Sequence, residues 1–201
     1  MGDRDIDLWF SVGSIYTYLT VMRIAEVEAK AGVRFRWRPF SIRTIMIEMD
    51  NRPMGKPAKL AYMWRDTQRR AQMYGHPFAL TPPYPLPNFD LANSIAVVGA
   101  EEGWCADYLR AAYKCWFGAH DPAGSDRNNA ESLAEIGQDA ARVLQRAASP
   151  EIAAAYKTAT DEARALGIFG VPSFVTRGEV FWGDDRLEDA VAWHSTGALA
   201  R

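Results

Sequence analysis

The sequence predicts an α/β fold in which a βαβ unit at the start of the chain and a ββα unit at its end share one sheet. Two short segments of strand character flank a helical one near the N-terminus, and two more precede the last helix. Between the two units the apolar pattern is almost wholly helical. We therefore expect one discontinuous sheet domain, residues 1–45 and 167–201, with residues 46–166 as an inserted helical subdomain.

The first unit has a regular pattern. Asp5–Phe10 is predicted to be a strand, Ile15–Ala31 a helix, and residues 33–38 a second strand. In 33–38 apolar side chains alternate strictly with arginines, so one face of this strand should be buried and the other polar.

The insertion is predicted to contain five helices, at residues 56–74, 88–102, 106–119, 130–147 and 150–166. One irregular tract, residues 81–87, holds four prolines, which preclude a helix and favour an extended loop. That loop either carries Tyr84 into a cleft or simply connects two helices.

The second unit begins after Gly167. Ser173–Thr176 and Glu179–Trp182 are predicted to form a hairpin, followed by a helix through residue 193. With 201 residues and 48% hydrophobic composition, the chain can bury a substantial core.

Ser14 lies where the first strand turns into a helix, and Pro172 opens the third strand after a peptide bond that can be cis. The element order and this pair are typical of a thioredoxin-like fold in which serine replaces the usual cysteine. In such sheets the proline lies beside the first helix, and the preceding residue, Val171, offers its backbone to an extended ligand. The Ser14 hydroxyl either caps the helix or faces a ligand; a thiol bound there would be favoured as thiolate.

Three further residues are candidates for ligand binding. Asp184 and Asp185 precede the last helix, where one carboxylate can cap the helix while the other binds a cation, with Arg186 orienting them. Asn51 and two lysines between 51 and 62 can reach anionic groups, although solvated loop residues would show the same pattern.

Composition argues against several classes of partner. A net charge of -2 and a pI near 5.9 predict no affinity for nucleic acid or anionic membranes. No apolar run approaches the roughly 20 residues of a membrane span, and no signal core follows the N-terminus, so cytoplasmic residence is expected. Cys105 and Cys115 are ten residues apart, and the three histidines are isolated, so no metal site is expected.

Four segments resemble one known family over nearly the whole chain. They are GSIYTYL at 13–19, Asn51 and Pro53 with Lys59 and Tyr62, FGVPS at 169–173, and WGDDRL at 182–187. The chain resembles 2-hydroxychromene-2-carboxylate isomerase and its relative, kappa-class glutathione transferase. This resemblance implies a DsbA-like thioredoxin fold with a helical insertion, glutathione as cofactor, a small aromatic substrate and a homodimer.

The resemblance also implies roles for individual residues. Ser14 would be the catalytic serine beside the glutathione sulfur, and Val171, before Pro172, would contact the cofactor through its backbone. Cofactor contacts are further implied for Asn51, Asp184 and Asp185, and a substrate contact for Tyr84. Ile15 stands where the family commonly has proline, and residues 43–48 do not match its substrate-contacting segment.

The leading hypothesis is an isomerase: the glutathione thiolate adds to an unsaturated aromatic acid, the adduct rearranges, and glutathione leaves unchanged. A transferase with the same site would release a stable conjugate. A DsbA-type disulfide oxidoreductase would need a CxxC pair, which the residues from Ser14 to Thr17 do not offer. A non-catalytic protein that binds a peptide or aromatic ligand in the cleft is the remaining class.

Overall fold

In the computed structural model, which describes residues 5–53, 55–76, 78 and 82–199, both ends of the chain build one sheet. Its strands are β1 (Asp5–Phe10), β2 (Arg34–Pro39), β3 (Ser173–Thr176) and β4 (Glu179–Trp182), in the order β2-β1-β3-β4. β2 runs parallel to β1, and β3 pairs antiparallel with both β1 and β4. The predicted α/β, thioredoxin-like fold with a helical insertion is therefore confirmed.

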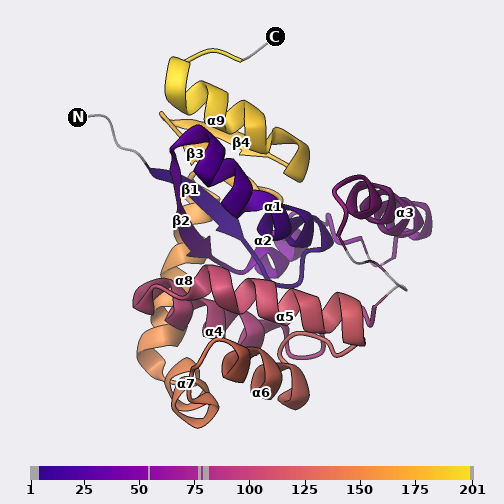
Figure 1. Ribbon diagram of the computed structural model, residues 1–201, viewed down its shortest axis with the longest axis vertical. Coiled ribbons are helices and arrows are strands. Elements are labelled where there is room, and N and C mark those ends of the chain that lie inside the picture. Colours follow the sequence, from indigo (N-terminus) through magenta and orange to yellow (C-terminus); the bar gives the residue numbers. More distant parts are fainter. Residues whose placement is uncertain (1–4, 54, 77, 79–81, 200–201) are drawn as a thin grey trace.

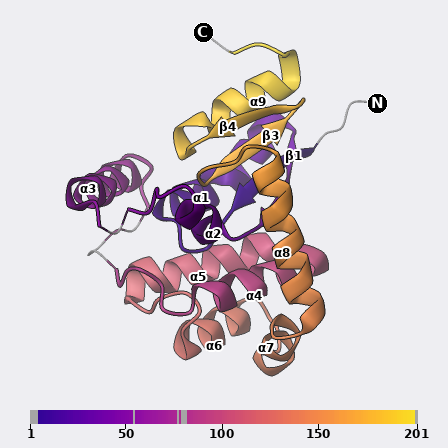
Figure 2. The ribbon, with the colours of Figure 1, turned by 180° about the vertical axis from the view of Figure 1, so that it is seen from behind.

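Helices surround this sheet on several sides (Figure 1). Figure 2 shows the same ribbon from behind, where α8 runs from the lower helices back to the sheet. The helices and one 3₁₀ turn are α1 (Ile15–Ala31), α2 (Ile42–Glu48), α3 (Pro57–Met73), α4 (Phe89–Glu102), α5 (Cys105–Ala119), α6 (Asp126–Glu135), α7 (Ala140–Ala147), α8 (Pro150–Ala165), η1 (Asp184–Arg186) and α9 (Leu187–Thr196).

The helices differ from the prediction mainly in two places. Residues 130–147 were expected to be one helix, but Gly137 adopts the left-handed backbone (φ 71°) and Asp139 caps a new helix, so α6 and α7 are separate. The short helix α2 was not predicted at all; its N-cap is Ser41, whose hydroxyl accepts a hydrogen bond from the Thr44 amide. The other predicted helices of the insertion are found with ends shifted by about one residue.

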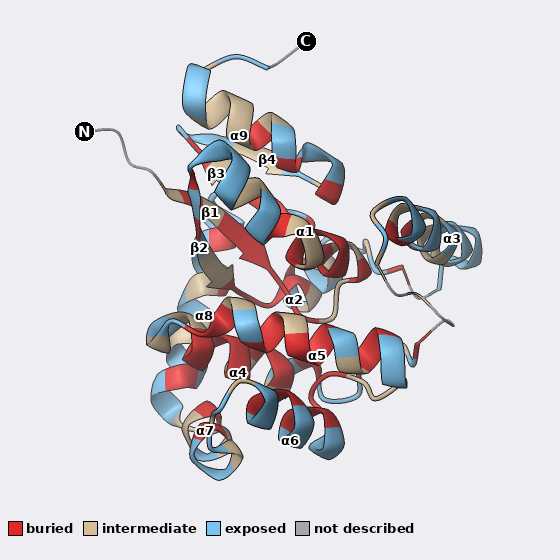
Figure 3. Ribbon diagram, in the orientation of Figure 1, coloured by how far each residue is buried: buried red, intermediate tan, exposed pale blue. Residues whose placement is uncertain are grey.

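One continuous cluster of buried side chains joins the sheet to the insertion. Tyr18 of α1 stacks on Phe117 of α5, with ring centroids 3.9 Å apart and planes 6° from parallel. Figure 3 shows the buried residues concentrated on β1, α4 and α5, whereas most of α3 is exposed. No helix within the described ranges combines the length and apolarity needed to cross a membrane.

The loop between β1 and α1 is fixed by polar groups of the insertion. The Val12 amide donates to Oδ1 of Asn93 (2.9 Å), and the Tyr113 hydroxyl donates to the carbonyls of Val12 (2.8 Å) and Ser14 (3.1 Å). A Cβ on Gly13 would lie 2.7 Å from the Phe89 ring, so the loop approaches α4 too closely for a larger residue. Helices α4 and α5 thus set the position at which α1 begins.

Helix α7 is attached to α4 through Glu102. Its carboxylate accepts hydrogen bonds from Arg142 (2.8 and 3.0 Å), from Arg146, and from the Trp104 indole (2.7 Å). The hydrogen bonds from Arg142 and the other donors lower the pKa of Glu102 to about 2, against the opposing effect of desolvation.

Replacing Asn93 with Ala tests the anchoring of the β1–α1 loop. The change leaves the buried Val12 amide without an acceptor, so we expect a loss of about 2 kcal/mol in the free energy of unfolding, measured by urea denaturation. Asn88→Ala is the control, because that exposed residue donates one hydrogen bond to the Gly124 carbonyl; it should cost less than about 1 kcal/mol. Equal losses would contradict the proposed anchoring.

Replacing Glu102 with Gln tests the attachment of α7. Because the folded-state pKa lies below the ordinary value, this carboxylate stabilises the fold above its ordinary pKa, and the contribution disappears as the pH falls through about 2. The free energy of unfolding of wild type should exceed that of the variant by about 1 kcal/mol near pH 7. This difference should become smaller as the pH is lowered to about 3. A gap that does not change with pH would show that the carboxylate charge is not responsible.

The matched control for this comparison is Glu101→Gln. Glu101 is adjacent, and its one ion pair, with Arg146 at 2.5 Å, is exposed. We expect it to change stability little at either pH.

Candidate functional site

The beginning of α1 forms one wall of a cleft of about 270 Å³. The other walls come from α2, the loop before α3, the first turns of α3, the proline-containing loop, and the segment before β3. This volume is near the lower end of the roughly 300 to 1,000 Å³ typical of small-molecule sites. Four of the residues predicted for the site line the cleft together: Ser14, Asn51, Tyr84 and Val171.

Ser14 is the N-cap of α1 and is half-buried. Its Oγ accepts a hydrogen bond from the Thr17 amide at 3.1 Å and donates to the Val171 carbonyl at 3.4 Å. The second distance is beyond the usual range for a hydroxyl donor, so the Ser14 proton is only weakly held by Val171. A hydroxyl donor and the positive end of a helix therefore face the same cleft.

Val171 is joined to Pro172 by a cis peptide bond. The structure thus places a cis-proline directly beside the N-terminus of α1, with the Val171 carbonyl toward Ser14. Pro172 itself does not line the cleft; its carbonyl accepts from the Gly183 amide at 2.9 Å.

Two aromatic residues that we did not predict for the site form one edge of the cleft. Phe169 and Trp182 pack edge to face with ring centroids 4.8 Å apart, and Trp182 is 52% exposed. A Cβ on Gly170 would lie 2.2 Å from the Trp182 indole nitrogen, which explains the glycine between Phe169 and Val171. The sequence signal was present, because Phe169 and Trp182 begin the two C-terminal motifs.

The lining of the cleft also holds the amide and the phenol predicted from the sequence. Oδ1 of Asn51 accepts a hydrogen bond from Nζ of Lys59 at 2.8 Å. Tyr84 packs edge to face on Trp64, with ring centroids 5.4 Å apart. Arg43 also lines the cleft, and the Cζ atom of its guanidinium lies 4.0 Å from the centre of the Phe89 ring.

Tyr16 connects the cleft with helix α3. It lines the cleft, and its hydroxyl donates to Oδ2 of Asp66 at 3.2 Å. Burial, together with the Asp66 charge, raises the pKa of Tyr16 above its ordinary value, so the phenol stays protonated. Its position two residues after Ser14 was the available sequence signal.

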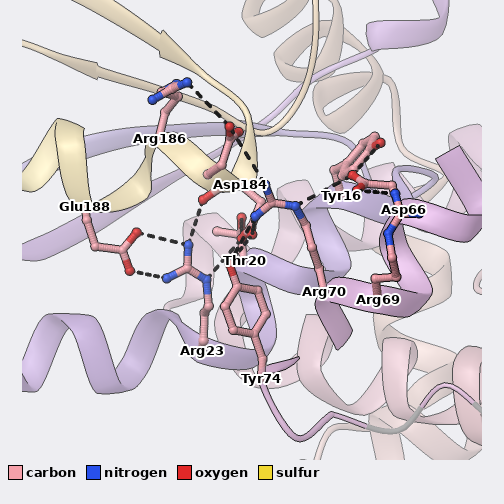
Figure 4. Close-up of polar contacts among 11 residues, drawn as sticks. Tyr16, Thr20, Arg23, Asp66, Arg69, Arg70, Tyr74, Asp184, Arg186 and Glu188 are labelled. Carbon is pink, nitrogen blue, oxygen red and sulfur yellow. Dashed lines mark hydrogen bonds and ion pairs between the residues drawn. The ribbon is translucent and has the colours of Figure 1, made fainter. Parts of the chain in front are cut away.

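The structure separates the two predicted carboxylates, and neither lines the cleft. The Asp184 side chain is only 1% exposed. It accepts hydrogen bonds from Thr20 (3.0 Å), Nε of Arg23 (3.1 Å) and Tyr74 (3.0 Å), as Figure 4 shows. These donors come from α1 and from the C-terminal end of α3, so Asp184 joins both helices to η1, which follows β4.

Asp185 remains more accessible than Asp184. Its side chain is 45% exposed and lies 3.9 Å from Arg70 and 3.6 Å from Arg186. Arg70 also approaches Asp184 (3.8 Å) and Asp66 (3.6 Å), which continues the polar contacts from Tyr16 to η1 (Figure 4). Of the two carboxylates, only Asp185 is accessible to a cationic group of a ligand.

The chain places neither of its cysteines in the cleft. Burial raises the pKa of Cys105, and burial together with Glu131 raises the pKa of Cys115 to about 11. Among the described residues no group of three His, Cys, Asp or Glu side chains is arranged to hold a metal ion. The cleft therefore offers a hydroxyl, a helix terminus and cationic side chains, but no thiol of its own.

Replacing Asp184 with Ala tests its buried position. Arg23, only 9% exposed, would keep Glu188 as a partner but lose the buried carboxylate, so we expect a loss of about 3 kcal/mol in urea denaturation. Asp185→Ala is the matched control and should cost less than about 1 kcal/mol, because its ion pairs are half-exposed. If the two variants lost equal stability, the distinction between the carboxylates would be wrong.

Comparisons with known proteins support this picture of the fold. The chain is 26% identical to 2-hydroxychromene-2-carboxylate isomerase of Sphingobium xenophagum over 190 residues, which cover 92% of this chain and 95% of that protein. A solved structure of 2-hydroxychromene-2-carboxylate isomerase matches with a TM-score of 0.81 and 24% identity, over 91% of this chain and 90% of that one.

A further structural match is the cytosolic disulfide reductase DsbM from Pseudomonas aeruginosa, solved with GSH. Its TM-score is 0.65 at 18% identity, over 95% of this chain and 96% of that one. The model of the DSBA-like thioredoxin domain matches residues 5–192, which include both halves of the sheet and the whole insertion. The chain therefore belongs to the family of DSBA-like thioredoxin domains.

Proposed function

We propose that this protein is a glutathione-dependent isomerase that acts on 2-hydroxychromene-2-carboxylate or a related unsaturated aromatic acid. The observation that carries the proposal is the Ser14 hydroxyl at the N-terminus of α1, which lines the cleft and lies 3.4 Å from the Val171 carbonyl. Support comes from the relatives named 2-hydroxychromene-2-carboxylate isomerase, which match nine-tenths of the chain.

The residues around the cleft fit glutathione in charge and in hydrogen-bonding character. Lys59 and Arg52 line the mouth and can pair with carboxylates, whereas the half-exposed Asp185 can pair with an ammonium group. Val171 offers backbone groups beside Ser14, and Asn51 adds an amide. The reductase of similar fold that was solved with GSH supports this choice of cofactor.

When bound, glutathione would supply a thiolate nucleophile that the chain itself lacks at this place. The Ser14 hydroxyl, weakly held by Val171, can turn its proton toward an anion in the cleft. The N-terminus of α1 favours the same negative charge, which lowers the pKa of a thiol placed there. Phe169 and Trp182 give one edge of the site an aromatic surface.

The alternatives differ in product and ligand. A kappa-class-like glutathione transferase would use the same residues but release a stable conjugate. A non-catalytic binding protein would be stabilised by another ligand and not by glutathione. A DsbA-type oxidoreductase is disfavoured because Ser14 and Thr17 stand where a reactive cysteine pair would be needed. That this protein forms a homodimer and that it is located in the cytoplasm both stay predictions.

Replacing Ser14 with Ala tests the proposal. We expect wild-type protein titrated with glutathione at neutral pH to show thiolate absorbance in ultraviolet difference spectra, and the variant to show none. A depression of one to two pKa units would raise the thiolate fraction from a few per cent by severalfold to more than tenfold. Product analysis by mass spectrometry then separates an isomer from a conjugate.

Ser41→Ala is the matched control for this titration. Ser41 also caps a helix, by accepting from the Thr44 amide, but it does not line the cleft. It should lower stability by about 1 kcal/mol and leave the thiolate signal intact. The proposal fails if glutathione gives no thiolate signal with wild type, or an equal signal with wild type and Ser14→Ala.

A further inference from the structure

The charged side chains among the described residues of the cleft lining are all positive. Three cationic side chains line it, Arg43, Arg52 and Lys59, and no Asp or Glu occurs among the described residues of its lining. Lys59 is exposed and engaged with Asn51, and Arg52 is exposed at the mouth. Arg43 differs from both because it is half-buried in the apolar part of the cleft.

The Arg43 guanidinium is held in place, but the described residues give it no counter-ion. Its Cζ lies 4.0 Å from the centre of the Phe89 ring, and Nη2 donates to the Leu86 carbonyl at 3.2 Å. Within the part of the chain that the structure describes, no carboxylate forms an ion pair with it. Removing a charge from water is costly unless it is paired, so this position favours an anionic ligand.

Phe89 also fixes the place of Arg43 relative to the Ser14 loop. The ring that carries the guanidinium is the same ring that a Cβ on Gly13 would touch at 2.7 Å. Arg43 and Gly13, the neighbour of Ser14, thus border the same aromatic side chain, and Arg43 and Ser14 line the same cleft.

Tyr84 supplies a second hydrogen-bond donor to the cleft. It lines the cleft, and its hydroxyl has no hydrogen-bond partner among the described residues. Burial raises the pKa of Tyr84, while the positive charge of Arg43 opposes that rise, as expected for two groups that lie close together. The phenol therefore keeps its proton at neutral pH and can donate it to an anion.

We propose that Arg43, with Tyr84 beside it, binds the carboxylate of the substrate and restricts the cleft to small flat acids. The inference rests on the proposed function and adds to it the group that recognises the acid. A carboxylate matches the planar fork of a guanidinium, and the phenol can donate to the same oxygen pair. The apolar side chains of Leu86, Met46 and Met63 would cover the ring of the acid.

The test is binding of trans-cinnamate and of its neutral analogue trans-cinnamamide, measured by titration calorimetry without glutathione. Wild type should bind cinnamate more tightly than the amide. Arg43→Met should weaken cinnamate binding by about ten- to a hundredfold and Tyr84→Phe by about two- to tenfold, with little change for the amide. Because no glutathione is present, the result is independent of whether Ser14 activates a thiol.

Two further variants make the test decisive. Arg43→Lys keeps the charge and the fold but not the fork, and should weaken cinnamate binding less than Arg43→Met does. Arg65→Met removes an exposed charge on α3 that contacts Gln68 and should leave binding unchanged. The inference is overturned if wild type binds acid and amide equally or binds neither. It is also overturned if Arg43→Met and Tyr84→Phe bind cinnamate as wild type does, or if Arg65→Met weakens it equally.

Discussion

The buried backbone of Val12, at the end of β1, is the constraint on which the rest of the structure depends. A strand that ends inside a protein leaves amide and carbonyl groups that must find partners. Here the partners are side chains of Asn93 and Tyr113, which belong to the insertion and not to the sheet. The insertion is therefore a structural part of the site, because the loop that presents Ser14 cannot keep its shape without it.

Helix α3 is attached to the molecule in a different way. Few of its side chains are buried, Thr67 and Ala71 among them, yet its first turns form one wall of the cleft. Polar contacts from Asp66, Arg70 and Tyr74 to α1 and η1 take the place of an apolar interface. Such contacts depend on direction, so they fix the orientation of a helix even where little apolar area is buried.

Much of this arrangement could be predicted from the sequence, and the exceptions have physical reasons. Strands and long helices follow from periodicity, and the motifs around Ser14 and Pro172 bring the right residues together. Helix α2 escaped prediction because seven residues carry too little periodicity, and the break at Gly137 escaped because a single glycine is tolerated in a helical pattern.

For the site residues, too, the sequence alone does not show which side chains matter. Asp184 and Asp185 are equivalent in the sequence, and only the tertiary contacts of Thr20, Arg23 and Tyr74 distinguish them. Arg43 is one of many arginines in the sequence; its importance follows from its half-buried position against Phe89, where no carboxylate of the described residues pairs with it.

The position of the two cysteines has a consequence for chemical durability. Cys105 is buried, the pKa of Cys115 is raised to about 11, and both lie outside the cleft. Alkylating and oxidising agents attack thiolates, so neither side chain is a ready target. A cleft built around a serine hydroxyl has no thiol of its own to lose to such damage. If its reactive sulfur comes from a diffusible molecule, each damaged sulfur leaves with that molecule and the protein is ready for the next one.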